Sequence, residues 1–195
     1  MPGSPERATR KSSSLDAWLA VDGYGFHEGF FHHPRYLGSS RRPRHLSGYG
    51  KRVFDQGLGR SFWFVFGSDA ERIAAAISNL DPTRHPDLWA GVGLACVYAG
   101  GCERENVERL ADLSGPFRNE LAQGASFGAK ARYRGGNLND HAEMASEIIC
   151  RTTATEAALL TDEVLAKINQ TEGGKSYEAW RQGIKRHYDE EHCHA

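Results

Sequence analysis

The chain has 195 residues and a formal net charge of −1, with 39% hydrophobic and 10% aromatic residues. This length and composition predict one globular domain with a hydrophobic core. The near-neutral charge argues against binding to nucleic acid or to an anionic membrane surface, because both attract proteins with a clear excess of lysine and arginine. No run of about 18 uncharged apolar residues is present, so we expect no membrane span.

Two features of the sequence indicate its cellular location. The chain shows no signal peptide, and its four cysteines form no CxxC pair. Cys96 and Cys150 fall in apolar helical patterns, where a buried free thiol is the usual interpretation. We therefore expect a reduced, cytoplasmic protein.

The two ends of the chain differ in composition from its middle. Residues 1–14 contain two prolines and three consecutive serines, and Met1 is their only large apolar side chain. Such a segment buries too little surface to offset the entropy lost on ordering, so residues 1–14 are predicted to be disordered. Residues 15–188 then form a helical domain, and the acidic, histidine-rich residues 189–195 form a flexible tail.

Apolar periodicity and helix-stop residues predict a succession of helices. Ser14 can cap a first helix that ends or kinks at Gly23, and Pro34 stops a second, short helix. Ser68 and Glu71 have the spacing of a capping box, which opens a later helix. The predicted helices, in chain order, are 15–21, 26–33, 50–66, 68–79, 86–98, 103–113, 116–134, 139–170 with a break at 152–155, and 175–188.

The predicted fold class is all-α, a compact multi-helix domain. No convincing alternation of apolar and polar residues, which would indicate a strand, extends over four or more residues. Residues 62–66 (FWFVF) have strand propensity, but they lie within a long helical pattern, so we expect a helix there as well. Small residues spaced four apart predict that some helices pack in close contact. They are Gly91, Ala95 and Ala99 in one row, and Gly124 and Gly128 in another.

Glycine occurs together with large aromatic residues in three stretches of the chain. These are DGYGFHEGFF at 22–31, YGKRVFDQGLGRSFWFVFG at 49–67 and DLWAGVGLACVYAGG at 87–101. Glycine costs up to about 1 kcal/mol relative to alanine in a helix interior, so its presence indicates the close approach of a backbone or of a ligand. The order and spacing of the three stretches resemble those of a family of uncharacterised bacterial proteins from gene clusters for enediyne antibiotics. The resemblance extends from about residue 18 to residue 180.

This resemblance implies a role in the biosynthesis of a polyketide natural product. It also implies that the chain corresponds to the C-terminal part of longer relatives, whose earlier part carries a motif similar to GYGFHEGFF. An apolar face that meets this earlier part would have to be covered by another chain. We therefore expect a homodimer, or a partner that resembles the absent part.

The densest group of titratable side chains is HExxxHH, which starts at His27. Glu28 and His32 are i, i+4 neighbours on a helix, and carboxylate and imidazole groups can share a zinc or iron ion. The order differs from the HExxH motif of zinc proteases. A helix end or a hydrogen-bonded histidine explains the same residues, so we predict no metal site, and the cofactor, if any, is unknown. If the protein is an enzyme, His27 or Glu28 is the candidate for acid–base catalysis.

Four further residues are candidates for substrate binding. Asp55 and Arg60 can anchor a polar substrate group, such as a carboxylate or a phosphate, although an internal Asp–Arg ion pair is the alternative. Trp63 and Phe30 can line a pocket for an elongated apolar molecule, although aromatic residues of this kind also form protein cores. The arginines of segment 36–47 are expected to lie in a solvated loop.

These observations leave hypotheses from different functional classes open. The first is an accessory protein of enediyne biosynthesis that binds or processes a hydrophobic polyene intermediate in a helical pocket. The second is a non-catalytic interaction or scaffold subunit that docks onto a partner through an exposed helical face. The third is a metal-dependent oxygenase, which would require bound iron. A cavity beside His27 and Arg60 would favour the first hypothesis over the second.

Overall fold

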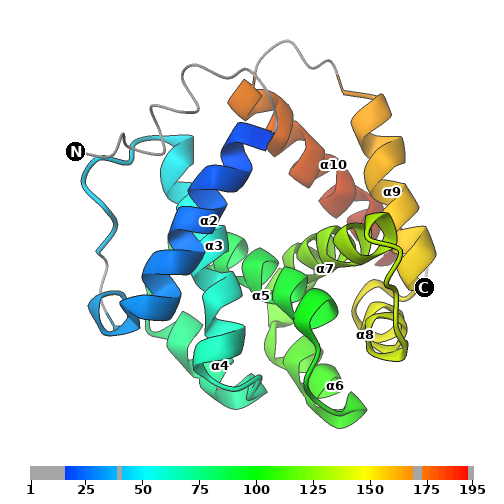
Figure 1. Cartoon of the computed structure of the whole chain (residues 1–195), viewed down its shortest axis with the longest axis horizontal. Helices are drawn as coiled ribbons and strands as arrows, with labels where there is room; N and C mark the ends of the chain where they lie inside the picture. Colours follow the sequence, from blue (N-terminus) through cyan, green and yellow to red (C-terminus); the bar gives the residue numbers. More distant parts are fainter. Residues whose placement is uncertain (1–15, 39–40, 169–172, 193–195) are drawn as a thin grey trace.

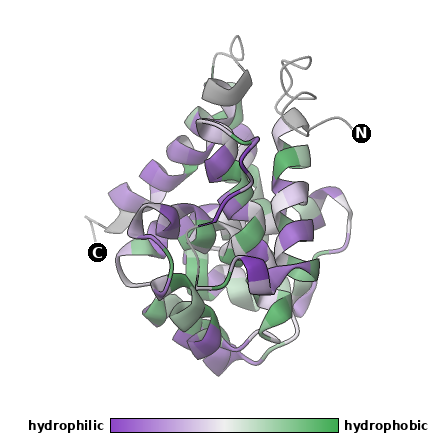
Figure 2. Ribbon diagram, turned by 90° about the vertical axis from the view of Figure 1, so that its left-hand side faces the viewer, coloured by the Kyte–Doolittle hydropathy of each residue, from purple (hydrophilic) through white to green (hydrophobic). Residues whose placement is uncertain are grey.

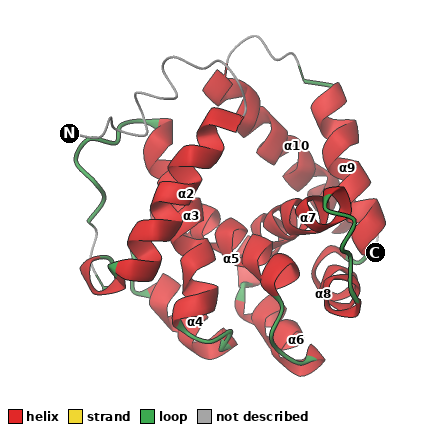
Figure 3. Cartoon of the chain, viewed as in Figure 1, coloured by secondary structure: helices red, strands yellow, loops and turns green. Residues whose placement is uncertain are grey.

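The computed structural model describes residues 16–38, 41–168 and 173–192. The segment 1–14 that was predicted to be disordered, and residues 193–195 of the predicted tail, lie outside these ranges. Within them the fold is all-α, as predicted, and no strand is present (Figure 3). None of the described helices combines the length and the apolar character that a membrane span requires. The elements are α2 (Asp16–Phe31), η1 (His33–Arg35), α3 (Tyr49–Val65), α4 (Ala70–Ser78), η2 (Pro82–Arg84), α5 (His85–Ala99), α6 (Arg104–Leu113), η3 (Gly115–Phe117), α7 (Arg118–Arg134), α8 (Asp140–Cys150), α9 (Ala154–Ala166) and α10 (Gly173–His192).

Three predicted helix boundaries differ from those of the structure. Gly23 does not end the first helix, since α2 continues without a break through the two predicted segments to Phe31. Ser68 does not cap α4, because its backbone is in the left-handed region with a φ of 59°. Asp69 takes this role, and its side chain accepts a hydrogen bond of 2.9 Å from the backbone N–H of Arg72. At the other end of the chain, α10 continues past residue 188, where the sequence predicted its end, to His192.

The helices pack around a row formed by α2, α3, α5 and α7. The most extensive contacts join α5 to α7, α2 to α3, and α3 to α5. Helices α8, α9 and α10 pack on α7, and α6 lies between α4 and α8, with contacts to both (Figure 1). Figure 2 shows that hydrophobic and hydrophilic residues alternate along most helices, as expected when one face of each helix meets the core.

Glycines allow the four helices of this row to approach closely. A Cβ atom placed on Gly57 of α3 would lie 1.9 Å from a backbone oxygen of α2. The same test gives 1.9 Å from Gly91 of α5 to a backbone oxygen of α3, and 1.8 Å from Gly124 of α7 to one of α5. No real Cβ atom fits at such distances, so each of these helix pairs requires glycine at the crossing point. The small-residue rows predicted from the sequence are therefore packing surfaces.

We predict opposite effects for two glycine-to-alanine substitutions. Gly91→Ala should destabilise the protein by about 1–3 kcal/mol or more, because the new methyl group collides with the backbone of α3. Gly23→Ala should stabilise it by about 0.5–1 kcal/mol, because nothing lies within 4 Å of the added Cβ and the helical backbone suits alanine. Urea unfolding of the two variants measures both effects, and similar effects of the two substitutions would contradict the proposed packing.

Candidate ligand-binding cavity

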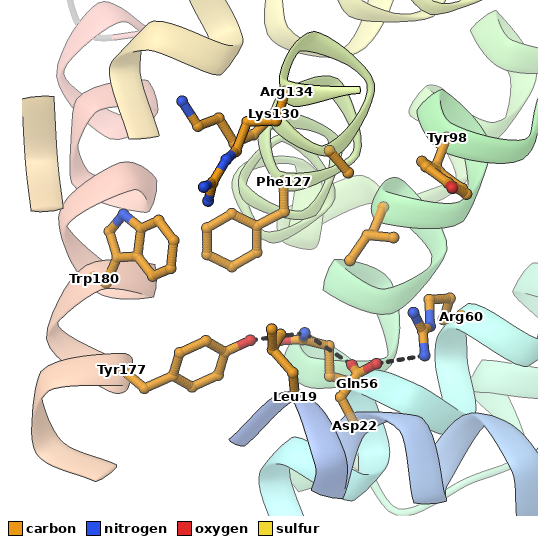
Figure 4. A pocket seen from close by; sticks show the side chains of 12 residues that line it. Leu19, Asp22, Gln56, Arg60, Tyr98, Phe127, Lys130, Arg134, Tyr177 and Trp180 are labelled. Atoms are coloured by element: carbon orange, nitrogen blue, oxygen red, sulfur yellow. Dashed lines mark hydrogen bonds and ion pairs between the residues drawn. The ribbon is translucent and has the colours of Figure 1, made fainter. Parts of the chain in front are cut away.

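A cavity of about 410 Å³ opens between α2, α3, α5, α7 and α10 (Figure 4). This volume lies in the range of small-molecule binding sites in proteins. Each of the five helices contributes at least two side chains to its lining, so the cavity is a product of the whole helix arrangement. The lining residues are Leu19, Asp22, Gln56, Arg60, Leu94, Tyr98, Phe127, Lys130, Ala131, Arg134, Tyr177 and Trp180.

Aromatic side chains form one wall of the cavity. The ring centroids of Phe127 and Trp180 are 4.7 Å apart, and those of Tyr177 and Trp180 are 6.3 Å apart. The indole N–H of Trp180 donates a hydrogen bond of 2.7 Å to the carbonyl oxygen of Thr161, which fixes the ring against α9. The wall is therefore a continuous apolar surface in a defined position.

A network of polar side chains lies at the floor of the cavity, where α2, α3 and α10 meet (Figure 4). The guanidinium group of Arg60 lies 2.6 Å from one carboxylate oxygen of Asp22. The amide nitrogen of Gln56 donates hydrogen bonds to the other carboxylate oxygen, at 3.0 Å, and to the hydroxyl of Tyr177, at 3.2 Å. Asp22, Gln56 and Tyr177 are at most 3% exposed, so this network is largely removed from solvent.

Burial changes the pKa of two groups of the floor. Burial raises the pKa of the Asp22 carboxyl group, while Arg60 and Gln56 act in the opposite direction. Burial, together with the charge of Asp22, raises the pKa of Tyr177 to about 12. The Tyr177 hydroxyl therefore keeps its proton at neutral pH.

Part of the hydrogen-bonding capacity of this floor is unused within the described chain. Tyr177 accepts a hydrogen bond from Gln56, which leaves its own proton free for another acceptor. The side-chain oxygen of Gln56 and the Nε of Arg60 are buried and have no hydrogen-bond partner among the described residues. Buried polar groups without partners are costly, so a ligand that supplies two acceptors and one donor would be stabilised here.

The charges of the lining favour a ligand with an acidic group. Arg60, Lys130 and Arg134 are cationic, and Asp22 is the one carboxylate among the lining residues given above. Lys130 is paired with Asp162. Arg134 makes no ion pair with any described residue, and its side chain extends toward the rings of Phe127 and Trp180 (Figure 4). It is therefore available to bind a carboxylate or a phosphate.

Arg60 is the one predicted site residue that lines this cavity. The alternative of an internal Asp–Arg ion pair is confirmed for both Asp55 and Arg60, although the two residues do not pair with each other. Arg60 pairs with Asp22, whereas Asp55 is fully buried and pairs with two other arginines. Arg84 lies 2.7 Å from one of its carboxylate oxygens, and the Nε of Arg42 donates a hydrogen bond of 2.8 Å to the other. The prediction of a wholly solvated arginine loop at 36–47 is also wrong for Arg42. Sequence spacing around Asp55 could not reveal partners 13 and 29 residues away.

Trp63 and Phe30, the predicted aromatic lining, lie elsewhere in the structure. Trp63 is 2% exposed, and its indole N–H donates a hydrogen bond of 2.9 Å to the carbonyl oxygen of Gly100. It therefore belongs to the core, the alternative that the sequence had left open. Phe30 is 39% exposed on the surface of α2.

His27 and Glu28, the predicted acid–base residues, also lie outside the cavity lining. The structure brings them together with His32 near the C-terminal end of α2. The expectation of a cavity beside both His27 and Arg60 is therefore met only for Arg60.

Sequence reasoning missed Asp22, Gln56 and Tyr177. Gln56 is i, i+4 to Arg60 on α3, so the two share a helix face, and this signal was available once Arg60 had been singled out. Asp22 begins the first glycine-rich stretch. Tyr177 lies in a polar helix more than 100 residues further along the chain, and nothing local connects it to the other two.

Over residues 4–188, the chain matches a family model that is described as a protein of unknown function, DUF1702. The chain belongs to this family. No curated protein and no solved structure matches it. The family description assigns no reaction, so the function of this DUF1702 member has to be inferred from its cavity.

We predict that Arg60→Ala destabilises the protein by about 1–3 kcal/mol. The substitution leaves the buried Asp22 carboxylate with Gln56 but without an opposite charge, and the cost is below that of a fully buried pair because Arg60 is 27% exposed. Arg109→Ala is the matched control, since Arg109 pairs with Glu71 at 2.7 Å while both side chains are more than half exposed. Its effect should stay within about 0.5 kcal/mol. Equal unfolding free energies of the two variants in urea would show that the Arg60–Asp22 pair does not contribute to the stability of the protein.

Proposed function

We propose that the protein binds an elongated, mostly apolar small molecule that carries an acidic group at one end and a carbonyl or hydroxyl group further along. The observation that carries this proposal is the combination, within one cavity, of an aromatic wall with a floor of buried and incompletely satisfied polar groups. A cavity that arose only from imperfect helix packing would have an apolar floor. A cavity for a polar metabolite would not need the adjacent rings of Phe127 and Trp180.

The arrangement of the lining suggests how such a ligand lies. Its apolar body would pack against Phe127 and Trp180, whose rings lie side by side in the aromatic wall. A carbonyl or hydroxyl oxygen of the ligand would accept a hydrogen bond from the hydroxyl of Tyr177. A ligand hydroxyl could also donate a hydrogen bond to the side-chain oxygen of Gln56. Its acidic group would pair with Arg134, which has no other ionic partner among the described residues.

The resemblance to the family of enediyne gene clusters suggests the chemical class of this ligand. A polyene intermediate of this class would be long and apolar, and it would carry a carboxylate or a carrier phosphate as its polar group. We therefore place the protein, as part of this proposal, among the accessory proteins of enediyne biosynthesis. If it also processes its ligand, Asp22 and Tyr177 are better placed for proton transfer than His27 and Glu28, because they line the cavity.

A cavity-filling substitution tests this proposal. Ala131 is exposed at the cavity wall on α7, so Ala131→Trp should narrow the cavity without disturbing the core. We expect the purified protein to bind parinaric acid, a fluorescent conjugated tetraene with a terminal carboxylate, and Ala131→Trp to weaken this binding at least tenfold. Fluorescence titration measures both.

Ala75→Trp is the matched control, because Ala75 is exposed on α4 and does not line the cavity. Its affinity for parinaric acid should equal that of the wild-type protein. Absence of binding by the wild-type protein would count against a polyene acid as the ligand class. Equal binding by the two tryptophan variants would place the ligand outside the cavity.

A second candidate function, docking onto another protein, is favoured by a cluster of aromatic rings on the surface of α2 and α3. Phe30, Phe31 and Phe64 are 39%, 63% and 43% exposed, and the Phe30 ring lies 5.0 Å from that of Phe31 and 6.3 Å from that of Phe64. Phe26 stacks on Phe30 at 5.8 Å and extends the cluster inward. Contiguous exposed rings of this kind are typical of interaction surfaces. A second copy of the chain is the simplest occupant, because such a patch can close about a two-fold axis.

Sedimentation velocity over a wide concentration range tests this second function. We expect the wild-type protein to self-associate and Phe31→Ser to remain monomeric, because the substitution removes the most exposed ring of the patch. Leu159→Ser is the control, as Leu159 is 39% exposed on α9, away from these rings. A wild-type protein that stays monomeric at high concentration would exclude self-association through this patch.

A further inference from the structure

The C-terminal end of α2 brings together three side chains with metal-binding atoms. We propose that His27, Glu28 and His32 bind one divalent transition-metal ion of the zinc type. The sequence pattern alone predicted no metal here, because a helix end or a hydrogen-bonded histidine explained the same residues. The proposal rests on the relative positions of the side chains, and it is independent of the ligand cavity.

The geometry of the three side chains suits a single ion. One ligand atom from each of them lies within 4.8 Å of the other two. His27 Nδ1 and His32 Nε2 lie 3.6 Å and 4.0 Å from the same oxygen of Glu28, Oε1. Ligands of a tetrahedral zinc ion bound at 2.0–2.1 Å are about 3.3 Å apart, so small side-chain rotations bring all three atoms onto one ion.

Two features of the surroundings hold this arrangement in place. The hydroxyl of Tyr36 donates a hydrogen bond of 2.6 Å to the other oxygen of Glu28, Oε2, so that Oε1 remains directed at the two imidazole rings. A hydrogen bond from a neighbouring residue to a ligating carboxylate is typical of metal sites. The helix ends at Phe31, and the negative end of its dipole favours a cation at this position.

The donor set determines which ions the site would prefer. Two imidazoles and one carboxylate suit zinc, cobalt, nickel or iron(II) better than calcium or magnesium, which prefer oxygen ligands. The side chain of His27 is 56% exposed and that of His32 is 39% exposed, so solvent can reach the ion and complete its coordination. Because none of the three residues lines the cavity, the proposal is a metal-binding site on the surface of α2 and no reaction is assigned to it.

The experiment measures the binding of Zn²⁺ and Co²⁺ to the metal-free protein. A background variant with His192→Ala, Cys193→Ser and His194→Ala removes the ligand groups at the end of the chain, which could bind metal non-specifically. Isothermal titration with Zn²⁺ gives the stoichiometry and the affinity. The visible absorption of Co²⁺ reports the geometry of its ligands. We expect one equivalent of each metal to bind.

Substitutions in the same background identify the ligands. His27→Ala and His32→Ala each remove one nitrogen ligand from a partly exposed side chain, so they should preserve the fold and lower the affinity by more than 100-fold. Tyr36→Phe should lower it by about tenfold, because Glu28 loses the hydrogen bond that orients it. His33→Ala is the matched control, since His33 is outside the cluster, and it should bind like the background variant.

Circular dichroism confirms that each variant retains its helix content. Absence of stoichiometric Zn²⁺ binding by the background variant would overturn the proposal. So would an affinity that His27→Ala and His32→Ala leave unchanged, or one that His33→Ala lowers equally. The last result would indicate non-specific binding by surface histidines.

Discussion

The close contact between the backbones of α2, α3, α5 and α7 is the constraint on which the rest of this structure depends. The carbonyl oxygen of Asp22 lies against Gly57, and that of Gln56 lies against Gly91. Asp22 and Gln56 therefore have two roles: their backbones form the helix crossing points, and their side chains form part of the cavity floor. A larger residue at Gly57 or Gly91 would displace the backbone that positions the Asp22–Gln56 hydrogen bond. Packing and the candidate site are thus set by the same contacts.

Three buried aspartates, Asp22, Asp55 and Asp87, differ in how many arginines neutralise their charge. Asp55 pairs with Arg42 and Arg84, and Asp87 pairs with Arg52 and Arg181. Two guanidinium groups compensate each of these carboxylates, so they serve to join helices and loops. Asp22 has one arginine, Arg60, and an amide, and it faces a cavity. It is therefore the buried carboxylate with the least compensation and the best access to a ligand.

Helix α2 carries features of three different kinds. Asp22 and Leu19 face the cavity, Phe30 and Phe31 form part of the exposed aromatic patch, and the residues of the proposed metal site lie near its C-terminal end. The ring of Phe31 lies 5.0 Å from that of His27, so the aromatic patch and the proposed metal site are neighbours. The side chain of Arg60 connects the patch to the cavity, because it pairs with Asp22 and its guanidinium carbon lies 4.8 Å from the ring centroid of Phe26. The first glycine-rich stretch of the sequence therefore contributes to every candidate site of the molecule.

The sequence by itself determined the all-α fold class, most helix boundaries and the role of glycine in close packing. These are local properties, because hydrophobic periodicity and helix-stop residues act within one helix. It also singled out Arg60, which lines the cavity, and it placed His27, Glu28 and His32 within one short segment. The tertiary structure alone decided that Asp55 pairs with Arg42 and Arg84, and that Tyr177 meets Gln56 from a helix 121 residues away. The physical reason is that periodicity shows which side chains share a face of one helix, whereas ion pairs and cavities form between helices whose order in space the spacing of residues does not specify.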